Sequence, residues 1–208
     1  MADTGWVLPG TAATNGTVDV AWSNQNNALT SDNSYATSST TFGNANPSLF
    51  SFEAWKAGSR VTWSNAYATS LTSSDAEYTI GTTTELWNTT WSAGDINNAG
   101  FGIGLRALFP GTFGDDESNY LVLTNYGFSI PDGSTINGIQ VKVEAKYSGE
   151  GPSFTANVDV VSLKVYYTAS GSGRNPSSGR SAASGRSSAS GRSSASGRSL
   201  VSSRSSVG

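Results

Sequence analysis

The chain has 208 residues, enough for one domain of ordinary size with an appendage, and it contains no Cys and no His. Their absence excludes disulfides, zinc–thiolate sites, thiol catalysis and a Ser-His-Asp triad, so an enzyme would have to work with carboxylates, Lys or Tyr. The net charge of −3 hides two opposite segments. Residues 1–170 contain all 15 acidic and six basic side chains, a charge of −9, whereas the last 38 residues contain six Arg and no acid.

Neither a membrane helix nor a secretory signal is expected. No apolar stretch approaches the roughly 18 residues that a membrane helix needs. The chain begins Met-Ala-Asp-Thr-Gly, which has neither the basic nor the apolar region of a signal peptide. The sequence therefore predicts a protein made in a cytoplasm, without membrane insertion.

Alternation of apolar and polar residues with period two runs through most of the chain before Thr168 and indicates half-buried strands. It predicts a short strand over 18–22. A second strand is predicted over 101–107, where two glycines either admit a close neighbour or mark a bulge. Over 139–147 every odd position is apolar and every even position is polar, which predicts a strand with one face in the core and one in water.

The remaining elements are a helical turn and a long final strand. Ser92 and Asp95 have the spacing of a capping box, which predicts one helical turn over 92–96. The last strand is predicted over 154–167, with a β-bulge where the alternation slips between Val160 and Val161. The pattern favours an all-β fold of about eight to ten antiparallel strands in two sheets, a jelly-roll-like β-sandwich.

The composition changes after Thr168, and residues 169–208 are almost wholly Ser, Gly, Ala and Arg. Such a segment buries too little apolar surface to offset chain entropy, so we predict a β-sandwich domain over 1–168 and an extended low-complexity tail over 169–208. Arginine recurs in the tail every six residues, at Arg174, Arg180, Arg186, Arg192, Arg198 and Arg204. Because six is a multiple of 2 and of 3, a strand or a polyproline-like chain would project all of them on one side.

Three interpretations of the tail stay open. In the first, it docks along an acidic surface, either a capsid lattice or the body of a neighbouring copy. In the second, it binds a phosphate backbone. In the third, it is a disordered tail that only adds solubility. Nucleic acid is not the expected partner, because the tail has no aromatic residue for base stacking and the acidic body would repel a polyanion.

No catalytic, cofactor or metal site is predicted. The run Asp115-Asp116-Glu117 is the densest acidic cluster, but its spacing does not match a calcium loop, and a solvated surface turn is favoured. A polysaccharide hydrolase that uses carboxylates alone needs two facing acids across a cleft. No such pair is singled out among Glu53, Glu77, Glu85 and Glu144. We therefore do not expect an enzyme.

The six tryptophans admit two interpretations. Trp22 lies in the apolar phase of its segment and is expected in the core. Trp87 and Trp91 are assigned either to the end of the core or to a glycan contact, since flat rings stack on sugar faces. A carbohydrate-binding adhesin would expose some of Trp55, Trp63, Trp87 and Trp91 around a groove.

One run, Ile-Pro-Asp-Gly-Ser-Thr-Ile-Asn-Gly-Ile over 130–139, leads directly into an alternating strand. Shorter stretches accompany it at 4–10, 21–24, 27–37, 86–87, 91–97, 101–103, 120–129 and 165–168. Together they resemble a β-sandwich module of tailed-phage structural proteins. The resemblance implies a virion-associated sandwich that builds fibres or decorates capsids, with no catalytic residues to transfer.

These observations lead us to expect a virion structural protein, a short fibre or capsid-decoration subunit at the virion surface, made in the host cytoplasm. It would form a homo-oligomer, with a trimer favoured, contact other virion proteins and dock by its basic tail. The alternative is a carbohydrate-binding adhesin that recognises a host surface glycan.

Overall fold

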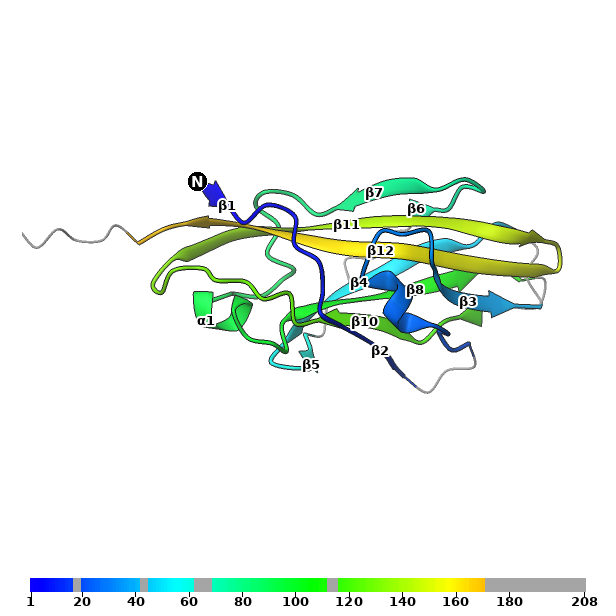
Figure 1. The fold of residues 1–208 in the computed structure, drawn as a ribbon, viewed down its shortest axis with the longest axis horizontal. Coiled ribbons are helices and arrows are strands. Elements are labelled where there is room, and N and C mark those ends of the chain that lie inside the picture. Colours follow the sequence, from blue (N-terminus) through cyan, green and yellow to red (C-terminus); the bar gives the residue numbers. More distant parts are fainter. Residues whose placement is uncertain (17–19, 42–44, 62–68, 112–115, 171–208) are drawn as a thin grey trace, which may run out of the picture. The chain divides into compact units, whose positions relative to one another are not determined.

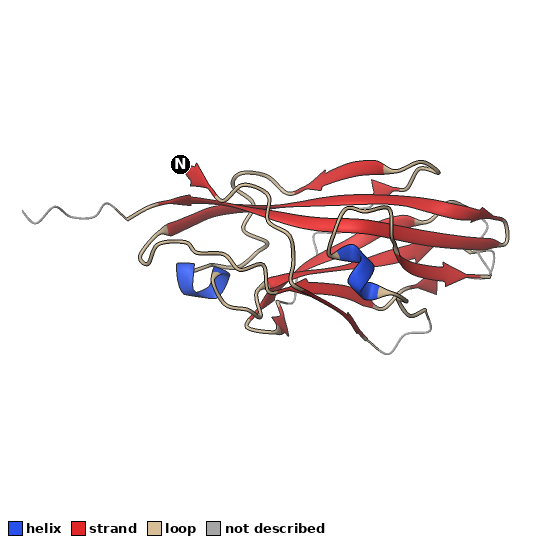
Figure 2. Cartoon of the chain, in the orientation of Figure 1, coloured by secondary structure: helices blue, strands red, loops and turns tan. Residues whose placement is uncertain are grey.

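The computed structural model describes residues 1–16, 20–41, 45–61, 69–111 and 116–170. In them, nearly all regular structure is β-strand, with one short 3-10 helix and one short α-helix (Figure 2). The strands form two antiparallel sheets, which confirms the predicted all-β sandwich. The chain divides into two units, Met1–Gly171 and Ser172–Gly208, and the second lies outside the described residues.

The first sheet is built on a long hairpin of β11 and β12 that runs the length of the first unit (Figure 1). Its strand order is β1 (Ala2–Asp3), β12 (Ser153–Thr168), β11 (Thr135–Glu150) and β7 (Ala76–Ile80), and β3 (Ala36–Thr40) also pairs with β12. The second edge of β12 is therefore covered by several short segments in turn. These are β1, a bridge from Val7, a bridge from Leu29, and β3.

The second sheet contains seven strands among the described residues. Its order is β2 (Thr11–Asn15), β10 (Tyr120–Thr124), β8 (Gly102–Phe109), β4 (Ser48–Lys56) and β5 (Ser59–Arg60). Two more short strands pair at its margins, β6 (Thr69–Ser70) with β4 and β9 (Asp116–Glu117) with β8. A Cβ atom on Gly104 would collide with the ring of Trp55, so the predicted close neighbour of the glycines in this strand is confirmed.

The alternation over 139–147 has the predicted effect. Ile139, Val141, Val143 and Ala145 are buried, while the polar residues between them are only half-buried on the outer face. The pairing of β11 with β12 shifts register where Glu144 faces Val160 and Ala145 faces Val158. Asp159 is thus the extra residue of a β-bulge, within two positions of where the sequence predicts it.

The hydrophobic core lies between the two sheets and takes side chains from both, including Leu105 and Leu121 from one and Val141 and Leu163 from the other. A short helix, α1 (Ala93–Ile96), adds Ile96 to this core. The predicted capping box begins the helix and is confirmed. Its two bonds run from the Asp95 amide to Ser92 Oγ at 3.1 Å and from the Ser92 amide to Asp95 Oδ2 at 2.9 Å.

The strand predicted over 18–22 is wrong in its described part. Val20 makes only an isolated bridge to Ser118, and residues 17–19 lie outside the described residues. Trp22 is nevertheless in the core, as predicted, and its indole Nε1 donates to the Asn119 carbonyl at 2.8 Å. The Trp22 side chain and isolated backbone bridges at Val20 and Ser23 therefore anchor this segment, just before the 3-10 helix η1 (Gln25–Ala28).

Candidate functional site

The tail arginines, Arg174, Arg180, Arg186, Arg192, Arg198 and Arg204, lie outside the described residues, as does Trp63. The other tryptophans named as glycan contacts are buried: Trp87 is 1 % exposed and Trp91 is 8 % exposed, and Trp55 is 3 % exposed in a separate cluster with Tyr120 and Val122. The indole N–H of Trp87 donates to the Ile139 carbonyl, and that of Trp91 donates to the Leu86 carbonyl, both at 3.0 Å. This corrects the glycan-contact interpretation of Trp87 and Trp91, because their rings and their N–H groups are used inside the fold.

The acidic run over 115–117 is not a solvated turn in its described part. Asp116 and Glu117 form strand β9; Asp116 accepts a hydrogen bond from Thr40 Oγ1 at 2.7 Å, and Glu117 pairs with Arg106. Asp115 lies outside the described residues. Within the part of the chain that the structure describes, no group of three or more Asp and Glu side chains is arranged to hold a metal ion.

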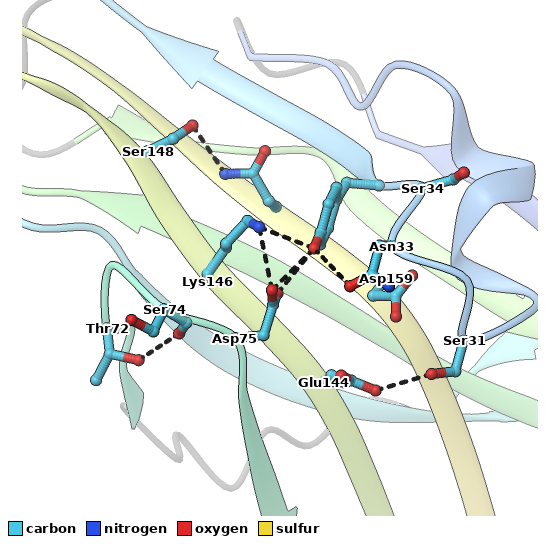
Figure 3. Close-up of polar contacts among 12 residues, drawn as sticks. Ser31, Asn33, Ser34, Thr72, Ser74, Asp75, Glu144, Lys146, Ser148 and Asp159 are labelled. Carbon is cyan, nitrogen blue, oxygen red and sulfur yellow. Dashed lines mark hydrogen bonds and ion pairs between the residues drawn. The ribbon is translucent and has the colours of Figure 1, made fainter.

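The carboxylates considered for a hydrolase are engaged separately. Glu53 pairs with Arg60, and the Trp87 amide donates to Glu85. Glu77 and Glu144 do face each other across the β7–β11 pair, an arrangement in which like charges repel. This repulsion is offset by Lys142, which pairs with Glu77 at 2.7 Å. It is also offset by Ser31, whose hydroxyl donates to Glu144 at 3.1 Å, the contact drawn in Figure 3.

The outer face of the five-stranded sheet carries a network of polar contacts (Figure 3). Lys146 of β11 donates to the Tyr35 hydroxyl at 2.8 Å and to Asp75 at 3.1 Å, and the Tyr35 hydroxyl donates to Asp75 at 3.0 Å. The hydrogen bonds to Tyr35 and then Asp75 raise the pKa of Lys146. Tyr35 precedes β3 and Asp75 precedes β7, so the network links these two segments to β11 and has a structural role.

The outer face of the seven-stranded sheet carries an aromatic cluster with paired charges. The ring of Tyr120 lies 4.1 Å from the Arg106 guanidinium and 5.5 Å from that of Arg60, and Trp55 packs against its edge. Burial, and then a hydrogen bond to Glu53, raises the pKa of Tyr120. Each Arg already has a carboxylate partner, so this cluster is satisfied internally.

One lysine differs from the other basic side chains in the described residues. Five ion pairs occupy Lys56, Arg60, Arg106, Lys142 and Lys146. Only Lys164, on β12, has no ion pair among the described residues. Its ammonium instead lies 4.8 Å from the centroid of the Trp6 ring and 6.0 Å from that of Tyr166.

Trp6 itself is a residue that sequence patterns did not single out. It is 36 % exposed, and the large hydrophobic side chains exposed in the described residues are Met1, Trp6 and Leu8. The only sequence signal is position: Trp6 precedes the Leu-Pro-Gly turn at 8–10 and belongs to no alternating run. Trp6, Lys164, Tyr166 and Gln140, together with Lys142 on the neighbouring strand, are called the Trp6 surface below.

No helix in the described ranges is long and apolar enough to cross a membrane. Comparisons of the chain with protein-family models, with curated proteins and with solved structures found no match.

Proposed function

We propose that this protein is a virion structural subunit, a short fibre or a capsid-decoration protein, whose sandwich assembles into a homo-oligomer and whose basic tail docks on an acidic neighbouring surface. The observation that carries the proposal is the separation of charge along the chain, −9 over residues 1–170 and +6 over the last 38. An all-β body with such a tail suits adhesion and assembly. The resemblance to phage structural modules points to the same class of protein.

The arrangement of charge in the body supports docking of the tail on another copy. Five of the six basic side chains of the body are already neutralised by ion pairs. By contrast, Asp32, Asp132 and Glu150 are exposed and have no ion pair among the described residues. Guanidinium groups bind carboxylates through two parallel hydrogen bonds, so an extended Arg ribbon is suited to such a surface.

The test replaces all six tail arginines, first by Gln and then by Lys. The Arg→Gln tail removes the charge, and the Arg→Lys tail keeps the charge but not the planar fork of donors. A third variant, with six tail serines changed to Gln, controls for the number of substitutions. Particles that carry the protein are identified by mass spectrometry, stripped, and incubated with each variant, and occupancy is measured by co-sedimentation over a salt series.

We expect the Arg→Gln variant to lose attachment at moderate salt, the Arg→Lys variant to retain part of it, and the Ser→Gln variant to attach normally. Salt should weaken the attachment of the unmodified chain, because surface charges are screened over about 8 Å at physiological ionic strength. Equal occupancy of the Arg→Gln and unmodified chains would refute tail docking. Absence of the protein from any purified particle would refute the virion assignment itself.

The adhesin alternative gains nothing from the tryptophans first considered for it. Trp55, Trp87 and Trp91 are buried, and Trp63 lies outside the described residues. Sugar binding by this chain would therefore need an aromatic residue other than these three buried ones.

A further inference from the structure

Trp6 is held in a fixed position although its ring is partly exposed. Backbone hydrogen bonds fasten the chain to β12 on both sides of it. On one side the Thr4 amide donates to the Val165 carbonyl at 3.1 Å, and on the other the Val7 amide donates to the Leu163 carbonyl at 2.9 Å. The Leu163 amide donates back to Val7 at 3.0 Å. A backbone fastened in this way loses little further freedom when a ligand packs on the side chain that it carries.

The exposure of Trp6 is not typical of the fold. The other tryptophans in the described ranges are all buried, at 8 % exposure or less. Trp6 keeps 36 % of its surface in water, and Leu8 nearby in the chain keeps 47 %. Tryptophan is the side chain most enriched where proteins bind partners, because one end is apolar and the indole N–H is polar.

The Trp6 surface holds one ammonium without an ion pair, on a body that is otherwise acidic, and the exposed Asp3 pairs with Tyr166 across the β1–β12 strand pair. Lys142 lies 5.5 Å from the centroid of the Trp6 ring, but Glu77 neutralises it. Lys164 makes no ion pair among the described residues, so its ammonium is free to take an anionic partner. Next to it, the Tyr166 hydroxyl donates to Gln140 Oε1 at 2.6 Å, and Gln140 Nε2 donates to the Gly81 carbonyl at 3.4 Å. The Tyr166 oxygen can still accept a hydrogen bond from a ligand, and the second N–H of Gln140 can still donate one.

We propose that the Trp6 surface binds an acidic saccharide, a pyranose ring that carries a carboxylate. The apolar face of the sugar packs on the indole of Trp6, and the carboxylate pairs with the Lys164 ammonium. Ring hydroxyls exchange hydrogen bonds with Gln140 and Tyr166. Charge complementarity selects an acidic sugar over a neutral one, because the ammonium lacks a protein counter-ion. This binding does not depend on the docking of the tail.

The experiment uses the full chain and a pair of probes, methyl galacturonoside and its neutral counterpart methyl galactoside. A ligand with a single charge limits binding to the tail arginines, and the tail is identical in all variants. The readout is the indole N–H signal of Trp6 in a two-dimensional NMR titration, assigned by its loss in Trp6→Phe. The variants are Lys164→Gln and, as a control for the loss of one positive charge, Lys56→Gln, whose lysine pairs with Asp95 and does not belong to the Trp6 surface. Thermal unfolding checks that each variant is folded.

We expect the acidic sugar to shift the Trp6 signal in the unmodified chain and in Lys56→Gln. Lys164→Gln should weaken that binding by about five-fold, as for a partly exposed charge pair. An absent shift, an equal response of Lys164→Gln, or equal binding of the neutral sugar would overturn the proposal. A Trp6 signal that responds to protein concentration alone, with a matching change in sedimentation, would assign the surface to a second copy and overturn it too.

Discussion

The hydroxyl of Tyr126 gives a sharp test of the packing described above. Tyr126 is 5 % exposed and stacks on Phe128, with ring centroids 5.8 Å apart. Its hydroxyl has no hydrogen-bond partner among the residues that the structure describes. A buried polar group without a partner costs about 1–3 kcal/mol of desolvation. Tyr126→Phe removes that group and keeps the ring, so we expect it to stabilise the protein by about 1 kcal/mol.

Tyr120→Phe is the matched control, because the same atom is deleted from a hydroxyl that has partners. The Tyr120 hydroxyl accepts from Arg60 at 3.3 Å and is hydrogen-bonded to Glu53. Its loss should destabilise by about 1 kcal/mol. For a body of this size, 1 kcal/mol corresponds to a shift of about 2–4 °C in Tm. The two variants should therefore move Tm in opposite directions.

The assay is urea and thermal unfolding at neutral pH and in alkaline buffers. Burial raises the pKa of Tyr126 well above its ordinary value of 10.0. Above that pH the unfolded chain loses the proton while the folded chain keeps it, so the stability of the unmodified protein falls as pH rises. Tyr126→Phe should remove this part of the fall. If Tyr126→Phe were less stable than the unmodified chain at neutral pH, the claim that the Tyr126 hydroxyl lacks a hydrogen-bond partner would be wrong.

Three further predictions concern local packing and charge. Gly104→Ala should destabilise by about 1–3 kcal/mol in urea unfolding, because the new Cβ meets the ring of Trp55. Gly94→Ala is its control and should not destabilise, since the nearest atom to a Cβ there is 3.8 Å away. Ser92→Ala removes the cap of α1 and should cost about 1 kcal/mol by the same measurement. Finally, the raised pKa of Lys146 means that its contribution is present below pH 10.5 and is lost as pH rises through the folded-state value. Lys146→Gln should accordingly flatten the alkaline limb of the stability profile, and an unchanged limb would contradict this.

The long hairpin β11–β12 is the part of the fold that sequence patterns predict best. Strand β11 alternates between buried and half-buried positions over many residues, so its hydrophobicity alternates with period two, and the bulge at Asp159 leaves a visible slip in the alternation of β12. The capping box at Ser92 is predictable for a different reason. Its two hydrogen bonds are local, and they follow from the presence of Ser at position 92 and Asp three residues later.

The short strands are not predictable in this way. In β3 the buried positions are Ala36, Ser38 and Thr40, so the alternation is not one of apolar and polar residues. Segments such as 20–22 are fixed by one side chain and by partners distant in sequence, which no local pattern encodes.

The same limit applies to the candidate sites. Trp87 and Trp91 are buried because particular carbonyls, those of Ile139 and Leu86, accept their N–H groups. A sequence does not show which carbonyls lie within reach. Trp6 is exposed because its segment lies on the edge of β12, and the lack of a carboxylate beside Lys164 appears only when the strands are paired.

The pairing of several short segments with one edge of β12 has a consequence for biosynthesis. The segments that cover this edge come from the first 40 residues, whereas the strand they attach to ends at Thr168. During translation these early segments leave the ribosome long before β12 is synthesised, so they have no pairing partner until most of the body has been translated. Folding of this chain is therefore expected to be late and slow, governed by closure of its longest loop.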